Sequence, residues 1–309
     1  MRLTGMGVAR MREVRRSSPP ERVGEVERVV DASFPFRKVS WQSRAEPTVV
    51  ELANGTRIGG REVVVAAGPC SPKGDERIIA IAHGLRAAGA TVLHAGVFRP
   101  HGGPYSGAGR GEGALEVLRR VREETGMAVM AEALDLESAR LLAACVDVLR
   151  IGPGNMQNFP LLRHAARLGK PMVLVRGHAA TIAELLMAAE YVLAEGNGDA
   201  ILCEAGVMGL TSDGHRVLDL TAVPVVQSLS HLPVMAAPGC LGDASVAAMS
   251  RAATAAGADG LIVEIQSPPA GDDHPDGFAR LMEQVGSVAR AMGRGLAPPL
   301  ARERALGAG

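Results

Sequence analysis

Two cysteines and two carboxylates of this chain have the residue types of a divalent-metal site. Cys70, Cys240 and Glu264 each stand at or just after the end of a short apolar segment, and Asp276 follows the last of them. If these segments are strands that end at one rim, the four side chains converge there, where unpaired charged groups are costly unless they bind metal. Ligands from separate strand ends indicate a catalytic metal. Two thiolates make the site soft, so we expect Zn²⁺, Fe²⁺ or Co²⁺ ahead of Mg²⁺, and Mn²⁺ is a further candidate.

Two other interpretations of these residues stay open. Each cysteine can be a small buried hydrophobic residue while the carboxylates pair with Arg176. Cys70 and Cys240 can also form a reversible disulfide. The chain has 4 cysteines without close pairing, so neither a disulfide framework nor a zinc-ribbon spacing is indicated.

A repeated pattern of short apolar segments must position these residues. Most of the segments are separated by Ala- and Leu-rich stretches with helical spacing, such as residues 76–88. The predicted strands are residues 62–67, 91–95, 128–131, 146–151, 172–175, 200–203, 233–237 and 260–265. Strands that are apolar on both faces favour a parallel sheet covered on both sides. The pattern therefore predicts the α/β class and a (β/α)8 TIM barrel. It argues against an open doubly wound sheet, because no GxGxxG follows the first strand.

The predicted barrel occupies residues 61–298, after an N-terminal extension in residues 1–60 and before a tail in residues 299–309. Within the extension, residues 49–52, the pair Asn54-Gly55 and residues 57–58 predict a β-hairpin, because Asn-Gly is the favoured two-residue turn. Such a hairpin could close the bottom of the barrel.

Composition limits the classes of partner. The chain of 309 residues is 47% hydrophobic and 21% charged, with a formal net charge of zero. No global field therefore attracts nucleic acid or an anionic membrane. No window reaches the roughly 20 apolar residues of a membrane span, and the basic start lacks the apolar part of a secretory signal. We expect a cytoplasmic protein that acts on a small molecule.

Further candidates follow from the rule that reactive groups of a TIM barrel project from the C-terminal ends of its strands. The predicted catalytic residues are Arg99, His101, Arg176, His178 and Glu204. The predicted substrate-binding residues are His94, Tyr105, Asn155, Gln157 and His231. His178 and His231 are either acid–base groups or satisfied surface or core histidines. Tyr105 either contacts substrate or packs, and Asn155, Gln157 and Asn158 either donate hydrogen bonds to substrate or cap the fourth strand.

One segment is specific. Gly68-Pro69-Cys70-Ser71 resembles the signature on the first strand of the microbial 3-deoxy-heptulosonate-7-phosphate (DAHP) synthases, to which the 3-deoxy-octulosonate-8-phosphate synthases are related. Other similar segments are residues 99–106 (RPHGGPYS), 151–159 (IGPGNMQNF), 176–177 (RG), 201–204 (ILCE), 230–233 (SHLP) and 262–264 (IVE). The similarity spans roughly residues 36–295 and is closest to the single-barrel form, without the ferredoxin-like regulatory domain of some members.

This resemblance implies an aldol-type condensation of phosphoenolpyruvate with erythrose 4-phosphate, a divalent metal and a homo-oligomer. The family's metal ligands are a Cys, a His, a Glu and an Asp. They correspond here to Cys70, Cys240, Glu264 and Asp276, with Cys240 in the place of the histidine. Because thiolate can replace imidazole, the resemblance still implies a metal.

The family's anion-binding cations are largely replaced. Arginines are replaced by His94, His101, Gly154 and Ala205, a lysine on the fifth strand by Val175, and a second lysine by Arg99. Each charge-assisted hydrogen bond is worth roughly 1.5–3 kcal/mol, so losing about four costs far more than the roughly 1.4 kcal/mol of a tenfold affinity step. Arg99, Arg110, Arg176, His94 and His101 could compensate in part.

The sequence therefore predicts a divergent metal-dependent enzyme that makes or breaks a C–C bond in a biosynthetic pathway, on a substrate less anionic than phosphoenolpyruvate. Two alternatives stay open. One is a true DAHP synthase with a rearranged set of cations, and the other is a non-catalytic barrel that binds a ligand or a partner.

Overall fold

Eight parallel strands close into a barrel in the computed structural model. The structure describes residues 36–69, 74–97, 113–209, 216–241, 244–265 and 275–298. The barrel strands are β3 (Glu62–Pro69), β4 (Val92–Ala95), β5 (Ala128–Ala133), β6 (Val148–Ile151), β7 (Met172–Val175), β8 (Ala200–Glu204), β11 (Val234–Leu241) and β12 (Gly260–Ile265). Each pairs with the next along the chain, and β12 pairs with β3, so the sheet has no free edge. The TIM-barrel prediction is confirmed.

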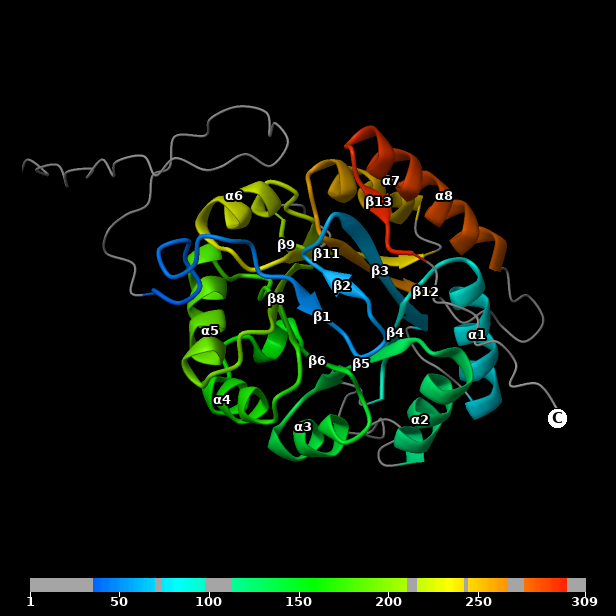
Figure 1. The fold of residues 1–309 in the computed structure, drawn as a ribbon, viewed down its shortest axis with the longest axis horizontal. Helices are drawn as coiled ribbons and strands as arrows, with labels where there is room; N and C mark the ends of the chain where they lie inside the picture. The colour runs from blue at the N-terminus through cyan, green and yellow to red at the C-terminus, as the bar shows by residue number, and fades with distance from the viewer. Residues whose placement is uncertain are drawn as a thin grey trace, which may run out of the picture.

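Helices surround this barrel (Figure 1). They are α1 (Asp75–Ala87), α2 (Gly113–Thr125), α3 (Leu136–Ala143), α4 (Phe159–Arg167), α5 (Ile182–Ala194), α6 (Ala222–Leu229), α7 (Ala244–Ala255) and α8 (Pro275–Ala291), with a 3-10 turn, η1 (Pro153–Asn155). The helix predicted at residues 76–88 is α1. Local capping chemistry sets some starts: Thr181 and Glu184 form a reciprocal capping box at α5. Of the described helices, none has both the length and the hydropathy needed to cross a bilayer.

The predicted hairpin is present as β1 (Val50–Glu51) and β2 (Arg57–Ile58), in which Val50 pairs with Ile58. Its apolar side chains lie in the same buried cluster as the first inward residues of the barrel strands. The Asn54 side-chain amide donates to the carbonyl of Thr91, 3.0 Å away, just before β4. The hairpin covers one end of the barrel (Figure 1), so it closes the N-terminal end, as the sequence suggested.

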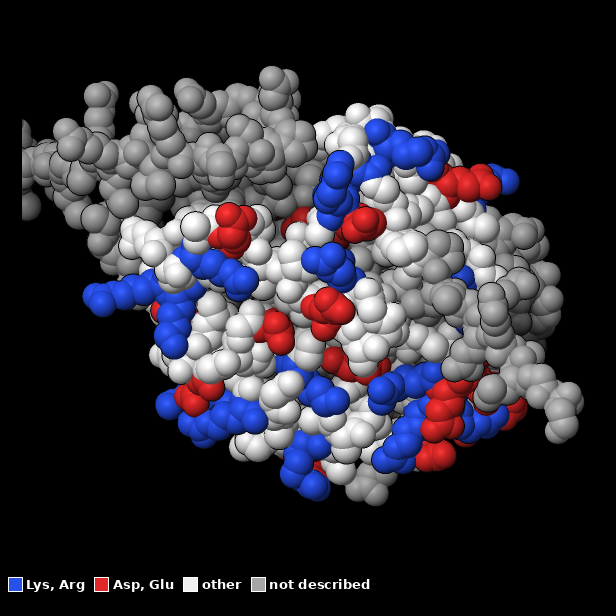
Figure 2. Space-filling view, viewed as in Figure 1, with Lys and Arg blue, Asp and Glu red and all other residues white. Residues whose placement is uncertain are grey.

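Three elements were not predicted. β13 (Gly295–Leu296) pairs with the start of β3, and β9 (Val207–Met208) pairs with β10 (Arg216–Val217) between β8 and α6. β3 also runs two residues further than predicted, because Gly68 and Pro69 still pair with β12. Proline is tolerated at the end of a strand, where its missing N–H costs little. Around the face in Figure 2, Lys and Arg alternate with Asp and Glu, as the zero net charge suggests.

Alternation along the strands sorts the side chains into two layers. Val92 of β4, Met130 of β5 and Val148 of β6 belong to the cluster inside the barrel. Side chains two residues apart on a strand face the same side. His94, Glu132 and Arg150, the next inward positions, therefore face the interior nearer the C-terminal ends of the strands.

Candidate active site

Three polar side chains on neighbouring strands line one side of the barrel's C-terminal end. Glu132 lies directly opposite Arg150 in the β5–β6 register, and the two form an ion pair. The two side chains are only 12% and 11% exposed. Gly152 makes room for this pair, because a Cβ there would lie 1.9 Å from Oε1 of Glu132. The sequence thus builds a nearly buried ion pair with a glycine beside it. We call His94, Glu132 and Arg150 the β4–β6 cluster.

His94 is the unusual member of the β4–β6 cluster. It is 6% exposed, and neither ring nitrogen has a hydrogen-bond partner among the described residues. The Nε of Arg150 is likewise buried without a partner there. Burial, with a smaller effect of the Arg150 charge, lowers the pKa of His94 to about 3. The imidazole is therefore neutral at physiological pH, with one donor and one acceptor.

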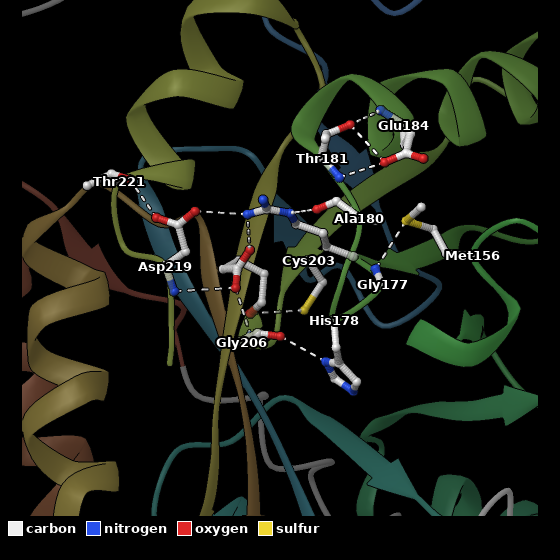
Figure 3. A network of polar contacts seen from close by, with 12 residues as sticks. Met156, Gly177, His178, Ala180, Thr181, Glu184, Cys203, Gly206, Asp219 and Thr221 are labelled. Carbon is white, nitrogen blue, oxygen red and sulfur yellow. Dashed lines mark hydrogen bonds and ion pairs between the residues drawn. The ribbon is translucent and has the colours of Figure 1, made fainter. Parts of the chain in front are cut away.

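A second ion-pair network lies at the ends of β7 and β8 (Figure 3). Nη1 of Arg176 lies 3.0 Å from Oε2 of Glu204 and 2.9 Å from Oδ2 of Asp219, and its Nε donates to the Ala180 carbonyl at 2.9 Å. The second Glu204 oxygen accepts from the backbone N–H of Gly206 at 2.7 Å. We call Arg176, Glu204 and Asp219 the β7–β8 network.

Within the β7–β8 network, the charge of Arg176 is matched by two carboxylates. Burial raises the pKa of Asp219, but hydrogen bonds from Thr221 and Arg176 outweigh it, so the pKa ends below its usual range. Asp219 is thus a carboxylate at neutral pH, and Arg176 is held between two carboxylates. A guanidinium fixed in this way is well suited to position its neighbours and poorly suited to attract a further anion.

His178 follows β7 and points toward the loop after β8 (Figure 3). Its Nδ1 lies 2.8 Å from the Gly206 carbonyl, and its Nε2 lies 2.9 Å from Nη1 of Arg216. A guanidinium can only donate, so Nε2 accepts and Nδ1 carries the proton. Arg216 is exposed and forms no ion pair with the residues that the structure describes. This pair places a histidine beside a cation at the rim.

The interior between these two groups is apolar. Val175 and Cys203 are fully buried in the cluster inside the barrel. Burial raises the pKa of the Cys203 thiol to about 12. Cys203 is therefore a small apolar residue here, with no thiolate for nucleophilic or ligand chemistry near neutral pH.

The four predicted metal ligands are described only in part. Across β11, β12 and β3, Cys240 is opposite Glu264, and Glu264 is opposite Gly68, two residues before Cys70. The backbone register is thus compatible with a shared ion, and Glu264 has no hydrogen-bond or ion-pair partner among the described residues. The side chains of Cys240 and Asp276, and all of Cys70, lie outside the described part, so the metal site and the alternative disulfide stay predictions. Within that part, no three His, Cys, Asp or Glu side chains form a metal-sized group.

Several other predicted residues have structural partners. The Asn155 side chain donates to the Leu134 carbonyl at 3.1 Å, and Asn158 caps α4 through the N–H of Leu161. Gln157 donates to Glu184 at 3.0 Å on an exposed surface. These contacts favour the capping interpretation of this segment.

His231 lies apart from the other candidates. It precedes β11, and so stands at the N-terminal end of the barrel, opposite the reactive rim. Its Nδ1 lies 2.8 Å from Oγ1 of Thr48 and its Nε2 lies 2.8 Å from the Lys38 carbonyl, with Trp41 packed edge-on. The ring therefore joins the N-terminal extension to the barrel, and the structure does not bring it together with the rim residues.

Arg99, His101 and Tyr105 lie outside the described residues, so their predicted roles are untested. Sequence reasoning missed the roles of Arg150, Arg216 and Asp219. Arg150 carried a signal, because it stands two residues after the inward Val148 in a predicted strand. Arg216 lies in the unpredicted β9–β10 hairpin and Asp219 follows it, and no periodic pattern marked them.

Comparison with known proteins decides the family. The family model of the DAHP synthetase I family matches residues 47–289. The chain belongs to this family. A Thermotoga maritima protein named phospho-2-dehydro-3-deoxyheptonate aldolase is 40% identical over 246 residues, which cover 79% of this chain and 72% of that protein. A 2-dehydro-3-deoxyphosphooctonate aldolase of Syntrophotalea carbinolica is 30% identical over 245 residues, covering 72% and 87% of the two chains.

Solved structures of the DAHP synthetase I family agree. The crystal structure of the Thermotoga maritima DAHP synthase superposes with a TM-score of 0.78 at 34% identity, covering 86% of this chain and 80% of that one. A truncated form of the Thermotoga maritima enzyme gives a TM-score of 0.75, with 84% of this chain and 99% of that chain covered. This protein is accordingly an aldol-type enzyme of the DAHP and 3-deoxy-octulosonate-8-phosphate synthase superfamily.

Proposed function

We propose that this member of the DAHP synthetase I family is a metal-dependent aldol-type enzyme whose substrate is less anionic than phosphoenolpyruvate. The observation that carries the proposal is the pairing of the two buried guanidinium groups. Arg150 is paired with Glu132, and Arg176 with Glu204 and Asp219. Neither is left to balance the charges of a phosphate and a carboxylate together.

The local charge balance supports the same conclusion. The described charged groups discussed at this end are three guanidinium groups and four carboxylates: Arg150, Arg176 and Arg216, with Glu132, Glu204, Asp219 and Glu264. His94 adds no charge, because its pKa is about 3. Val175 and Gly154 add none, at positions where the resemblance to the family implies a lysine and an arginine. Apart from the metal, three positive and four negative groups leave a net charge of −1, so these side chains do not balance a multiply charged anion.

The metal would be held by Cys70, Cys240, Glu264 and Asp276, of which Glu264 is the described carboxylate without a partner. When bound, a divalent cation polarises a carbonyl group or stabilises an enolate. The residues of the chain have separate tasks. The β7–β8 network fixes the loop after β8, His178 joins that loop to Arg216 at the rim, and Val175 and Cys203 exclude water from the interior. Arg99, His101 and Tyr105 stay candidates for contacts with the second substrate.

The test combines metal analysis with a substrate comparison. We expect the purified protein to contain about one divalent ion per chain, and Glu264→Gln to lose it. Glu137→Gln, a change of an exposed carboxylate on α3, is the matched control and should keep the metal. Holoenzyme is then assayed with erythrose 4-phosphate and other aldehydes as acceptors. Phosphoenolpyruvate and unphosphorylated 2-oxo acids are compared as donors. Turnover confined to unphosphorylated donors supports the proposal, and metal-free protein with unchanged stability after chelation contradicts it.

One observation favours the standard DAHP synthase reaction instead, namely the 40% identity to the Thermotoga maritima protein. In that case Arg216 and the arginines outside the described residues would replace the lost cations. Efficient turnover of phosphoenolpyruvate with erythrose 4-phosphate in the same assay would establish this reaction and overturn the proposal.

A further inference from the structure

Three buried polar atoms in the β4–β6 cluster have no hydrogen-bond partner among the residues that the structure describes: Nδ1 and Nε2 of His94, and Nε of Arg150. Leaving one such group unsatisfied costs about 1–3 kcal/mol, so native proteins rarely keep several together without a ligand or water. His94 is opposite Met130 on β5, two residues before Glu132, and Glu132 is opposite Arg150 on β6, so His94 and Arg150 lie in the same part of the barrel. Both are at least nine-tenths buried. The cluster is therefore a built polar site rather than a surface feature.

The available atoms define what can bind. Nε of Arg150 can only donate, and neutral imidazole offers one N–H. Two donors directed at one ligand suit the two oxygens of a carboxylate. The one formal positive charge is already shared with Glu132. Such a site favours a group with a single negative charge and disfavours a dianion, because the Glu132 carboxylate repels the second charge.

The cluster also lies beside the predicted metal site. Gly68 approaches the His94 backbone so closely that a Cβ there would lie 1.7 Å from the His94 carbonyl oxygen. Gly68 in turn is opposite Glu264 on β12. A small ligand that reaches from His94 past β3 would thus approach the ends of β3 and β12. The layer beneath it is closed by Val92 and Met130, which limits the depth of the site.

We infer that His94 and Arg150 bind the carboxylate of a small monoanionic 2-oxo acid, with Glu132 as a positioning residue that sets the guanidinium and limits the charge of the ligand. This inference rests on the proposed function, because it names the substrate class of the same site. Arg150 is then a residue that determines specificity, and it stands on β6.

The test is calorimetric binding of pyruvate to the holoprotein, compared with 2-oxoglutarate and phosphoenolpyruvate. We expect pyruvate to bind more tightly than either more highly charged ligand. The double variant E132Q/R150Q removes both charges but leaves amide groups that can hydrogen-bond to each other, which protects folding. It should weaken pyruvate binding at least about tenfold, because a charge-assisted hydrogen bond is lost. His94→Phe keeps the ring volume and should weaken binding roughly three- to tenfold.

Arg163→Gln on α4 is the matched control, because Arg163 is 53% exposed and pairs with Glu195 on the outside of the barrel. It should bind pyruvate like the unchanged protein. Pyruvate affinity that is the same in E132Q/R150Q and in the control overturns the inference. So does an absence of pyruvate binding, in which case ordered water alone satisfies the cluster.

The two proposals fail in distinguishable ways. A metal-containing enzyme that uses unphosphorylated donors, with affinity insensitive to Arg150, would contradict only the carboxylate site. An enzyme that turns over phosphoenolpyruvate efficiently, yet binds pyruvate through Arg150, would contradict only the proposed choice of substrate.

Discussion

The β4–β6 cluster and the β7–β8 network are both buried around an arginine, yet they differ in how completely their polar atoms are satisfied. Arg176 donates to two carboxylates and a carbonyl, and Glu204 accepts from a backbone N–H as well. In the β4–β6 cluster, three buried nitrogens have no hydrogen-bond partner within the described part of the chain. A satisfied network stabilises one local structure, whereas an unsatisfied one keeps binding capacity for a ligand.

The largest loss of stability is expected from a change in the hydrogen-bonded β7–β8 network. Glu204→Ala leaves Arg176 with one carboxylate fewer and the Gly206 N–H without its acceptor. We expect the free energy of unfolding to fall by about 3–5 kcal/mol, as when one partner of a buried ion pair is removed. Urea denaturation measures this, with Glu137→Ala on exposed α3 as the control that should change by less than about 0.5 kcal/mol. A loss below about 1 kcal/mol would contradict a stabilising role for the β7–β8 network.

The β4–β6 cluster should respond in the opposite way. Replacing both Glu132 and Arg150 by Met exchanges a buried ion pair for apolar side chains, which is often neutral or stabilising by about 1–4 kcal/mol. We expect no loss of unfolding free energy in this double variant, together with loss of activity. Paired denaturation and activity measurements check it. A variant that is strongly destabilised, or that stays fully active, would remove the contrast between the two regions.

Acid should weaken the fold through His94. Its pKa is about 3 in the folded protein and about 6.5 when unfolded, so below pH 6.5 the unfolded state binds one more proton. The free energy of unfolding should therefore fall by up to about 1.4 kcal/mol for each pH unit between about 6.5 and 3. Denaturation midpoints at pH 7, 6 and 5 measure this dependence of stability on pH. His94→Gln should make it smaller by the contribution of one titrating group. Burial also lowers the pKa of His231. His231 therefore adds a pH dependence of the same sign to the unchanged protein and to the His94→Gln variant.

The smallest effect concerns the segment after Arg176. Thr181→Ala removes the side-chain cap of α5, whose Oγ1 accepts from the Glu184 N–H at 3.2 Å. We expect a loss of about 1 kcal/mol in unfolding free energy. Thr181→Ser should restore most of it, because serine keeps the hydroxyl. Loss of activity with normal stability would instead show that the cap helps to position His178 or Arg176.

Much of the architecture could be predicted from local patterns. Two barrel strands, β7 and β12, lie at the predicted bounds, and the Asn54-Gly55 turn forms the expected hairpin. The prediction was less complete where a strand ends in an irregular way, as in β11, whose register with β12 shifts between Ala236 and Gly239. Such a shift depends on the neighbouring strand, and residue order alone does not show it.

The sequence placed some residues of the candidate site correctly and misplaced one. The positions of His94, Arg176 and Glu204 at strand ends followed from the barrel rule. The misplaced candidate was His231, whose motif stands before a strand rather than after it, so that its ring contacts Thr48 and Lys38 instead of the rim. A histidine close to a strand in sequence can lie at either end of the barrel.

By itself, the sequence determined the eight-strand barrel, the hairpin at its base and the family, because apolar periodicity, turn residues and motif positions are properties of neighbouring residues. The tertiary structure alone decided which charges are already paired and which buried nitrogens are left without a partner. Those contacts join strands and loops that are distant in sequence, and only closure of the barrel and the register of its strands bring them together.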